Sequence, residues 1–415
     1  MPLSLQPVSG DEFAGLIAPL GPWAGASRIA VAVSGGADSL CLALLAARWA
    51  AARGIATCGL IVDHALRPAA AAEAETTRAR LSAHAIDAVI LRLRGLDHGP
   101  ALAARARAAR YAALTEACRQ RGLVDLLLGH HAGDQAETVL MRSRAGSGPD
   151  GLAGMAAIAE TNDLRLLRPL LGIDPARLRH TLQAMGLDWV EDPSNRDVRA
   201  LRTRLRSELA DNPALAADLR AEARAAGNRR ADHDAAQAAL LAGSAMLRPE
   251  GFALLPRGLL PPRALAALLR TIAGAAHAPP AASVEALTRR PRLATLGGAR
   301  LLPAGRLGAG WLVVREASQV QGPIMAAPGV FWDRRFRLCA QAVPKGATIA
   351  ARRHPGLPAR VGAVMPALLD AAGDVCAGAR FELVPPSPAT AAPSFPEQAR
   401  LSGAARVNDN YLEIK

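Results

Sequence analysis

The sequence lacks the cysteine patterns that mark metal or redox centres. Its five cysteines are scattered and odd in number, and no two of them stand in C-x-x-C spacing. This distribution argues against a zinc site, an iron–sulfur cluster or a redox dithiol, and it predicts reduced thiols.

Long apolar runs are also missing. No segment reaches the roughly eighteen uninterrupted apolar residues that mark a membrane-spanning helix. The N-terminal stretch MPLSLQPVSGDEFAGLIAPL has no basic region ahead of an apolar one, as a secretory signal would have. We therefore expect a soluble, cytoplasmic protein with no membrane partner.

Lysine is scarce, whereas arginine is abundant, and the net charge is +13. Guanidinium groups match phosphate oxygens, so this excess favours a phosphate-rich partner. A GC-rich genome would also raise the arginine content, and charge alone leaves both explanations open. The 415 residues, 51% of them hydrophobic, allow about two to three domains with sizeable cores.

The first half of the chain alternates short apolar runs with longer helical patterns. The predicted strands are Ile29–Val33, Thr57–Val62, Ala88–Leu93 and Val124–Leu128. The predicted helices are Ser39–Ala52, Ala69–Ala85, Ala101–Arg121 and Asp134–Arg144. This order predicts an α/β fold with a parallel sheet and right-handed crossovers.

The second half changes in character. Sequence rich in Ala, Arg and Glu begins near residue 212, and strand-like pieces begin near residue 294. We predict three parts: a parallel-sheet domain over residues 1–211, a helical region over residues 212–293, and a smaller α+β domain over residues 294–415.

A glycine-rich turn follows the first predicted strand. It consists of Ser34, Gly35, Gly36, Ala37, Asp38 and Ser39. A glycine pair lets the backbone approach a ligand closely, and the start of the next helix is an anion site. The turn is not a Walker A sequence, and Asp38 would repel a polyphosphate unless a divalent cation lay between them. The turn therefore suggests a magnesium-bound pyrophosphate that leaves.

This hexapeptide, between a strand and a helix, resembles the PP-loop of the ATP pyrophosphatases. The resemblance implies cleavage of ATP between the α and β phosphates to adenylate an acceptor. It also implies that these six residues bind ATP and that Asp38 is associated with Mg²⁺.

Other polar residues follow later strands of the predicted sheet, and in parallel sheets the carboxyl ends of the strands meet at one edge. His64 follows the second strand and is a candidate for binding the nucleotide, although a structural role is also open. Arg107 and Arg110 lie three residues apart on one face of a predicted helix, so they can meet one anion or form a solvated basic face.

The stretch LLLGHHAGDQAETVLMR follows the fourth strand. His130 stands at the strand end, and Asp134 and Glu137 share a helix face, where two carboxylates can hold a cation or an amine. Helix capping is an alternative role for Asp134. A zinc site is not favoured, because further soft ligands are missing nearby.

The His-His-x-x-Asp-x-x-Glu-Thr pattern of this stretch resembles the tRNA(Ile)-lysidine synthetase family of PP-loop enzymes. The segment LRPLLGIDPARLRHTLQAMGLDWVEDPSNRD extends the resemblance, which is strong over about residues 29–209. Beyond them it is weaker and rests on LATLGGARLLPAGRLGAGWLVVRE and VGAVMPALLDAAGDV. Gly133 and Thr203 depart from the family, which has Asp and Asn at these positions.

The resemblance implies that lysine is joined to the wobble cytidine of the isoleucine tRNA with a CAU anticodon. ATP would adenylate the cytidine, pyrophosphate would leave, and the lysine amine would then displace AMP. Arg107 or Arg110 would stabilise the phosphates, and His130, Asp134 and Glu137 would bind or orient lysine and the adenylate.

The resemblance also implies a large RNA partner. Four arginines would track the tRNA backbone: Arg196, Arg199, Arg202 and Arg206. A solvated charged face is the alternative for them. The regions 212–293 and 294–415 would bind the tRNA body. A homodimer remains open.

Two rival functions remain. A PP-loop tRNA thiolase would deliver sulfur instead of lysine, but such enzymes generally need paired cysteines. A tRNA-binding protein without catalytic activity is the second rival.

Overall fold

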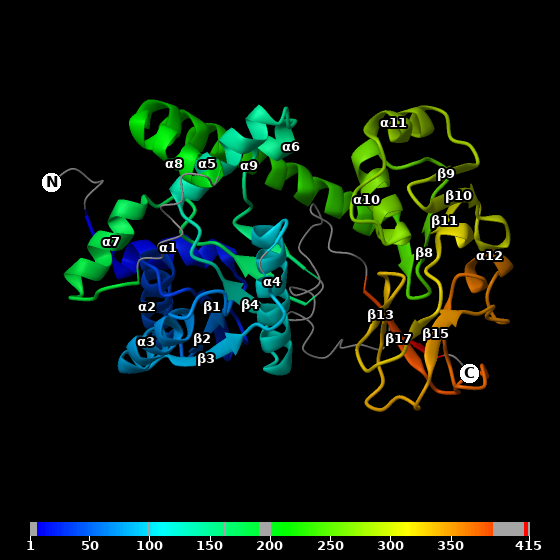
Figure 1. The fold of residues 1–415 in the computed structure, drawn as a ribbon. Coiled ribbons are helices and arrows are strands. Elements are labelled where there is room, and N and C mark those ends of the chain that lie inside the picture. Colours follow the sequence, from blue (N-terminus) through cyan, green and yellow to red (C-terminus); the bar gives the residue numbers. More distant parts are fainter. Residues whose placement is uncertain (1–5, 98, 162, 191–200, 385–410, 414–415) are drawn as a thin grey trace. The chain divides into compact units, whose positions relative to one another are not determined.

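The computed structural model describes residues 6–97, 99–161, 163–190, 201–384 and 411–413. It divides into two compact units, Met1–Ala231 and Asp232–Lys415, drawn along the chain from blue to red in Figure 1. The boundary falls inside helix α9, Pro213–Ser244. The predicted division at residues 211 and 293 stays a prediction.

A six-stranded sheet forms the centre of the first unit, in the order β3-β2-β1-β4-β6-β5 (Figure 1). Its strands are β1 (Arg28–Val33), β2 (Ala56–Asp63), β3 (Asp87–Arg92), β4 (Asp125–Leu127), β5 (Ile158–Glu160) and β6 (Arg165–Leu167). All neighbours pair in parallel except β5 and β6, which are antiparallel. The predicted parallel sheet is confirmed, and the structure adds two strands that the sequence did not reveal.

Helices connect the strands and cover the sheet. They are α1 (Gly10–Ile17), α2 (Ala37–Ala51), α3 (Ala70–Ala83), α4 (Leu102–Gln120), α5 (Ala132–Arg144), α6 (Pro149–Leu152), α7 (Pro175–Ala184) and α8 (Leu201–Asp211), with a short 3₁₀ turn η2 at Ala18–Leu20. The four helices predicted in the first half correspond to α2, α3, α4 and α5.

Both faces of the sheet are buried, which explains the nearly continuous apolar sequence of β1. Ile29 and Val31 belong to one core cluster with Leu40 of α2. Ala30 belongs to a second cluster with Leu114 of α4. Because side chains alternate along a strand, β1 contributes to both layers.

A buried ion pair joins two neighbouring strands at the amino end of the sheet. Arg165 Nε lies 2.7 Å from Asp125 Oδ1, and both side chains are almost fully buried. The remaining guanidinium nitrogens donate to the carbonyl oxygens of Leu20 and Gly21, each at 3.0 Å. The pair therefore fastens the N-terminal segment to the sheet, with its buried charges matched by hydrogen bonds.

The described residues of the second unit form antiparallel sheets and helices, and they include the end of α9. One sheet has the order β7-β8-β11-β10-β9, a second β12-β15-β16, and a third β13-β14-β17-β18. The strands are β7 (Met246–Arg248), β8 (Phe252–Leu255), β9 (Ala294–Leu296), β10 (Ala299–Pro303), β11 (Trp311–Arg315), β12 (Ile324–Met325), β13 (Phe331–Trp332), β14 (Phe336–Leu338), β15 (Thr348–Ala351), β16 (Pro366–Leu369), β17 (Arg380–Leu383) and β18 (Tyr411–Glu413). The helices are α10 (Pro262–Ala273), α11 (Ala281–Arg289) and α12 (Ala359–Gly362), and two 3₁₀ turns are η4 (Gly305–Leu307) and η5 (Ala317–Gln319). The predicted α+β character of the C-terminal part is confirmed.

Asp333 is the centre of a buried charge network in this unit. Its carboxylate accepts hydrogen bonds from Arg315 at 2.9 and 3.0 Å and from Arg335 at 2.8 Å. Arg335 is fully buried, and burial lowers its pKa to about 10. Its remaining nitrogens donate to the carbonyl oxygens of Gly251 and Val364, which connects three separate stretches of the unit.

The cysteines differ between the two units. Cys41, Cys58 and Cys118 of the first unit are buried, whereas Cys339 and Cys376 of the second are half-buried. Burial raises the pKa of Cys41 and of Cys118 to about 12, so both are neutral thiols at ordinary pH.

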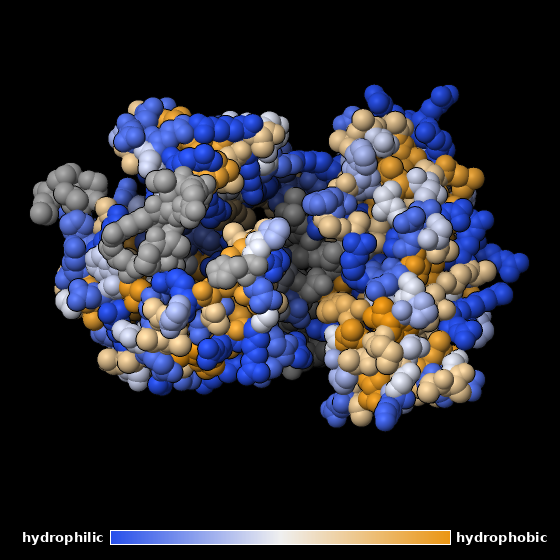
Figure 2. Space-filling model, in the orientation of Figure 1, coloured by the Kyte–Doolittle hydropathy of each residue, from blue (hydrophilic) through white to orange (hydrophobic). Residues whose placement is uncertain are grey.

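The surface of each unit is mixed in polarity. Figure 2 shows hydrophilic side chains over much of the visible face of each unit, with apolar side chains between them. Among the described residues, no helix is both long and apolar enough to span a bilayer.

Candidate active site

The loop between β1 and α2 has a backbone conformation that glycine favours. Gly35 has φ +84°, and a Cβ atom there would lie 2.5 Å from Thr77 Oγ1 of α3. A side chain at this position would be strained and would also clash. The local sequence Ser-Gly-Gly therefore permits a turn that passes directly against α3.

Hydrogen bonds hold this loop in place without a ligand. Ser39 Oγ accepts from the Ser34 backbone N–H at 3.0 Å and lies 3.1 Å from Ser34 Oγ. The Val190 N–H donates to the Gly35 carbonyl oxygen at 3.0 Å. Gly36 precedes α2, and no described side chain caps that helix. The N–H groups of its first turn therefore point toward the site where an anion can bind.

Asp38 lies at the start of α2. Its Oδ1 atom is buried and has no hydrogen-bond partner among the described residues, while Oδ2 lies 3.5 Å from His131 Nε2. Among those residues no group of three metal-ligating side chains occurs. A carboxylate oxygen that has no hydrogen-bond partner fits Mg²⁺, which binds through one or two carboxylates together with phosphate and water oxygens.

The loop after β4 approaches the start of α2 very closely. A Cβ atom on Gly129 would lie 3.0 Å from Ser39 Cα and 3.1 Å from the Ser39 backbone nitrogen. Glycine at this position therefore allows the strand ends of β1 and β4 to bring their polar residues together.

His131 contacts both acidic positions of the site. It is the N-cap of α5, and its Nδ1 atom accepts from the N–H groups of Gly133 and Asp134, at 3.1 and 3.4 Å. Its Nε2 atom lies 3.5 Å from Asp38 Oδ2 and 3.6 Å from Asp134 Oδ2. Burial favours neutral His131, but hydrogen bonding to Asp38 and the charges of Asp134 and Asp38 outweigh it and raise its pKa.

His131 was not among the candidate residues that the sequence suggested. The signal was present as the His-His dipeptide, but residue type alone did not distinguish the two imidazoles. The start of α5 at Ala132 decides the matter, because it makes His131 the cap and directs it toward Asp38. A Cβ atom on Gly133 would lie 2.9 Å from the His131 ring, so the departure from the family's Asp at this position bears on the same imidazole.

The carboxylates of Asp134 and Glu137 have different partners. Asp134 Oδ2 accepts a hydrogen bond from the backbone N–H of His131 at 3.1 Å, which completes a capping box. Glu137 is 2% exposed, and its Oε1 atom accepts from Arg206 Nε of α8 at 2.8 Å. The other oxygen of Glu137 is buried and has no hydrogen-bond partner among the described residues.

His130, which also follows β4, lies near the charges of three arginines. Burial and the charge of Arg168 lower its pKa to about 4, with Arg107 and Arg110 acting in the same direction and Asp134 opposing them. His130 is therefore neutral at pH 7. Arg168 follows β6 and was also not singled out by the sequence, because β6 spans only three residues and gives no periodic signal.

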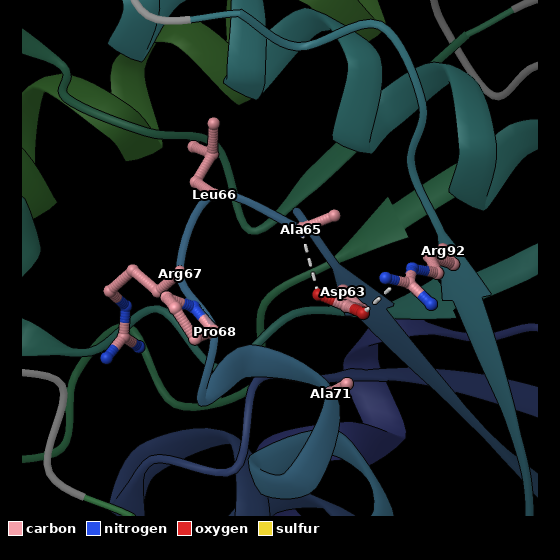
Figure 3. A pocket seen from close by; sticks show the side chains of 7 residues that line it. All are labelled: Asp63, Ala65, Leu66, Arg67, Pro68, Ala71 and Arg92. Carbon is pink, nitrogen blue, oxygen red and sulfur yellow. Dashed lines mark hydrogen bonds and ion pairs between the residues drawn. The ribbon is translucent and has the colours of Figure 1, made fainter.

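The residue after β2 belongs to a different part of the sheet edge. His64 is half-buried and lies between Asp63 and Ala65 in the sequence. Both of these neighbours line a pocket of about 320 Å³, together with Leu66, Arg67, Pro68, Ala71 and Arg92 (Figure 3). Asp63 accepts from the Ala65 N–H at 2.8 Å and lies 3.7 Å from Arg92 Nε. Arg67 forms a bidentate ion pair with Glu73, at 2.9 and 3.2 Å. A polar pocket therefore opens at the carboxyl ends of β2 and β3.

The structure describes two of the four arginines predicted to contact the tRNA backbone. Arg196 and Arg199 lie outside the described residues. Arg202 is exposed on α8, and Arg206 on the same helix is paired with Glu137. The predicted contacts of these residues with tRNA stay predictions, as do the predicted roles of the other site residues.

The parallel sheet, the Ser-Gly-Gly turn at its carboxyl edge and the open Asp38 define a PP-loop ATP-binding protein. A family model described as a PP-loop domain matches residues 7–213. The most informative relatives are named tRNA(Ile)-lysidine synthase. The protein from Ruegeria pomeroyi is 34% identical over 77% of this chain and 78% of its own, and that from Methylobacterium nodulans is 39% identical over 72% and 88%. The chain belongs to the tRNA(Ile)-lysidine synthase family, a family of ATP-dependent ligases.

Other relatives match a shorter stretch of the chain at higher identity. The relative from Rhodopseudomonas palustris is 44% identical over 198 residues, which are 47% of this chain and 56% of that protein. The chain thus spans little more than half the length of that relative. Among solved structures, a U34-tRNA thiolase from Methanococcus maripaludis has a TM-score of 0.44 and 15% identity, covering 52% of this chain and 77% of the thiolase. Similarity at that level carries no conclusion about function.

Proposed function

We propose that this protein joins L-lysine to the wobble cytidine of the isoleucine tRNA with a CAU anticodon, at the expense of ATP. The observation that carries the proposal is the similarity to tRNA(Ile)-lysidine synthases across both units. The contact between His131 and Asp38 supports it, because it joins the ATP loop to the helix that bears the two carboxylates.

The reaction would begin at the loop after β1. The C2 oxygen of the cytidine would attack the α-phosphorus of ATP, and pyrophosphate would leave toward the N–H groups of α2. The lysine ε-amine would then attack C2 of the adenylated cytidine, and AMP would leave. When bound, Mg²⁺ would neutralise developing phosphate charge, and Asp38 would hold it.

The other residues would act on the two organic substrates. His64 lies on the β2 side, where the nucleotide base would reach. Arg107 or Arg110 would stabilise phosphate charge, since charge development rather than covalent chemistry dominates such transfers. His130, Asp134 and Glu137 would bind or orient lysine and the adenylate, and a carboxylate pair suits an ammonium group.

The tRNA would contact more of the chain than this edge of the sheet. Arg196, Arg199, Arg202 and Arg206 would meet the RNA backbone, and residues 212–415 would bind the tRNA body. A cytoplasmic location and a homodimer stay expectations from the sequence.

Mass spectrometry of tRNA nucleosides tests the proposal directly. Purified full-length protein should convert the wobble cytidine to lysidine only when ATP and lysine are both present. The Asp38→Asn variant and a methionine tRNA, which has the same anticodon, are the matched controls. A cytidine left unmodified by folded wild-type protein in the presence of ATP and lysine would contradict the proposal.

The same samples separate the two rival functions. A thiolase would produce a sulfur-containing nucleoside when a sulfur donor is supplied. A non-catalytic RNA-binding protein would show no exchange of pyrophosphate into ATP, with or without tRNA.

A further inference from the structure

Three arginines gather around one tyrosine, Tyr111 of α4. Arg107 and Arg110 of α4 lie with their Cζ atoms 5.0 and 5.4 Å from the centre of the Tyr111 ring. Arg107 also donates to the Tyr111 hydroxyl at 3.5 Å. Arg168 follows β6. Burial lowers the pKa of Arg168, and its hydrogen bond to Tyr111 acts in the opposite direction. These residues, with His130, form the Tyr111 cluster.

The cluster contains buried nitrogen atoms that have no protein acceptor. Among the described residues, Nε of Arg110, Nε of Arg168 and Nδ1 of His130 are all buried without a hydrogen-bond partner. Arg168 is 8% exposed, and none of the three arginines pairs with a described carboxylate. Leaving buried charged donors unpaired is costly, which indicates that an absent ligand supplies the acceptors.

Arg168 is held in position by its surroundings. Its Nη1 atom donates to the Ala156 carbonyl oxygen at 2.8 Å, and its backbone N–H donates to the Ala157 carbonyl oxygen at 2.8 Å. The guanidinium group is therefore fixed before any ligand arrives, with Nε left over. Fixed guanidinium groups recognise the oxygens of carboxylates and phosphates.

The place of the cluster in the sheet favours an RNA phosphate over the phosphates of ATP. The ATP loop follows β1, and the pocket beside His64 lies at β2 and β3, whereas His130 and Arg168 follow β4 and β6 on the other side of β1. Arg110 and Tyr111 reach them from α4, which packs against β2 and β3. The carboxylates of Asp38 and Asp134 meet at His131, which directly precedes α5 and adjoins His130. These two negative charges lie at the junction between the ATP loop and the cluster. The phosphates of ATP would lie at the loop after β1, with Mg²⁺ held by Asp38, whereas the RNA brings a separate phosphate on each side of its cytidine.

We infer that Arg110, Arg168 and His130 bind a backbone phosphate next to the target cytidine of the RNA substrate. This inference rests on the proposed function for the identity of the RNA. Tyr111 acts as a positioning residue, because its ring contacts the guanidinium groups of Arg107 and Arg110 and its hydroxyl accepts a hydrogen bond from Arg107. Arg107, which is exposed, remains the candidate for the phosphates of ATP.

A chemical double-mutant cycle tests the phosphate contact. Isoleucine tRNAs are assembled with a neutral methylphosphonate in place of one phosphate on either side of the target cytidine. Their affinity for full-length protein is measured without ATP or lysine. One of the two substitutions should weaken binding by wild-type protein by about tenfold or more, the usual effect of losing a charged hydrogen bond.

The protein side of the cycle uses two variants. Arg168→Lys keeps the charge but removes the guanidinium fork, and Arg110→Ala tests a less buried position in case Arg168→Lys does not fold. Each folded variant should bind native tRNA less tightly by a similar factor and should lose its sensitivity to the methylphosphonate. For Arg110→Ala, which removes a charge, the slope of log affinity against log salt should fall by about 0.7 for one lost phosphate contact in a single-stranded loop. Arg119→Ala is the control on the same helix, because Arg119 is exposed and paired with Glu116.

Three outcomes overturn the inference. In the first, the fold losses in affinity from the methylphosphonate and from the protein variant multiply, as they would for independent contacts. In the second, neither methylphosphonate weakens binding by wild-type protein. In the third, the variants lose ATP affinity and keep tRNA affinity. The lysidine assay is run separately on wild-type protein. Coupled losses without lysidine formation would refute the proposed reaction and keep the phosphate site, whereas lysidine formation without coupling would do the reverse.

Discussion

Arg206 Nε lies 2.8 Å from Oε1 of Glu137, so a cation from α8 already occupies one side of a carboxylate that is itself 2% exposed. Burial favours neutral Arg206, but Glu137 and the charges of Asp134 and Asp38 outweigh it and raise its pKa. The pair spans 69 residues of sequence and joins α8 to α5. Any ammonium group that uses Glu137 must share it with Arg206 or take its free oxygen.

Replacing Glu137 by Gln should weaken the use of lysine more than the formation of the adenylate. The change removes the charge that attracts an ammonium group and keeps the size of the side chain, so we expect the lysine concentration for half-maximal rate to rise by about tenfold to a hundredfold. Titrating lysine against trapped adenylated tRNA measures it. Unaltered lysine dependence with slower adenylation would move Glu137 to the nucleotide side. Glu208→Gln on α8 is a surface control, since its partner Arg144 is exposed.

Replacing Asp38 by Asn should abolish ATP-dependent adenylation while tRNA affinity stays within a few-fold. The substitution removes a charge facing the cation and changes no basic surface. Release of AMP and gel-shift titrations on the same preparation measure the two effects. Wild-type rates of AMP release would exclude the metal role. The exposed Asp11→Asn variant serves as the control.

Two substitutions at His131 separate capping from chemistry. Asn is a good N-cap but is too short to reach Asp38, whereas Ala removes both functions. We expect His131→Ala to lower the free energy of unfolding by about 1 kcal/mol and His131→Asn to lower it much less. Both variants should lose adenylation activity to a similar extent. Wild-type activity in a folded His131→Asn protein would show that the contact with Asp38 is not needed.

The low pKa of His130 makes a signed prediction about pH. The folded value is about 4 and the unfolded value about 6.5, so below pH 6.5 the unfolded chain binds a proton that the folded chain does not. The contribution of His130 is therefore present above pH 6.5 and lost as pH falls toward 4. Between pH 7 and pH 5 it should cost about 2 kcal/mol.

Urea unfolding of wild-type protein and of His130→Gln at both pH values isolates this contribution. The variant should lose about 2 kcal/mol less than wild-type protein over the same interval. His131 acts with the opposite sign, because its raised pKa gives stability that is present at low pH and lost as pH rises, and it is unchanged in both proteins. Equal losses in the two proteins would refute the low pKa of His130.

Removing the second unit should weaken tRNA binding by about a hundredfold or more, because specific RNA contacts need a large buried surface and several phosphates. A cut near residue 212 would also delete Leu219 and Ala223, which pack against α5 and α8. The better fragment therefore ends at Ala231, the edge of the first unit. A folded fragment that binds as tightly as the full chain, with the same salt dependence, would remove the second unit from tRNA recognition.

The sequence predicted the parts of the fold that depend on local signals. The β-branched run of β1, the glycine pair and the apolar α2 are contiguous, and each has its own propensity. The three-residue strands β5 and β6 are too short to show a period, so no periodic pattern marked Arg168 as a neighbour of the site. The strand β8 pairs with β11, which is more than fifty residues away, and only the folded chain shows this pairing.

The candidate site was predictable by residue type but not by partner. The sequence marked Asp134 and Glu137 as one helix face, and helical spacing makes them neighbours. Helix capping by Asp134 was one of the two roles that the sequence left open, and the capping box confirms it. The sequence could not show that Glu137 meets Arg206, because that contact depends on the packing of α8. It also missed His131, because the role of this residue as N-cap depends on where α5 begins.

Because the thiols differ in burial, their rates of chemical labelling can measure how often the first unit unfolds. A thiol-reactive dye added to the native protein would attach at Cys339 or Cys376, while Cys41, Cys58 and Cys118 stay shielded and protonated. Labelling of the last three requires the first unit to expose its core. Peptide mapping after timed labelling would therefore follow the unfolding of the first unit without any engineered cysteine.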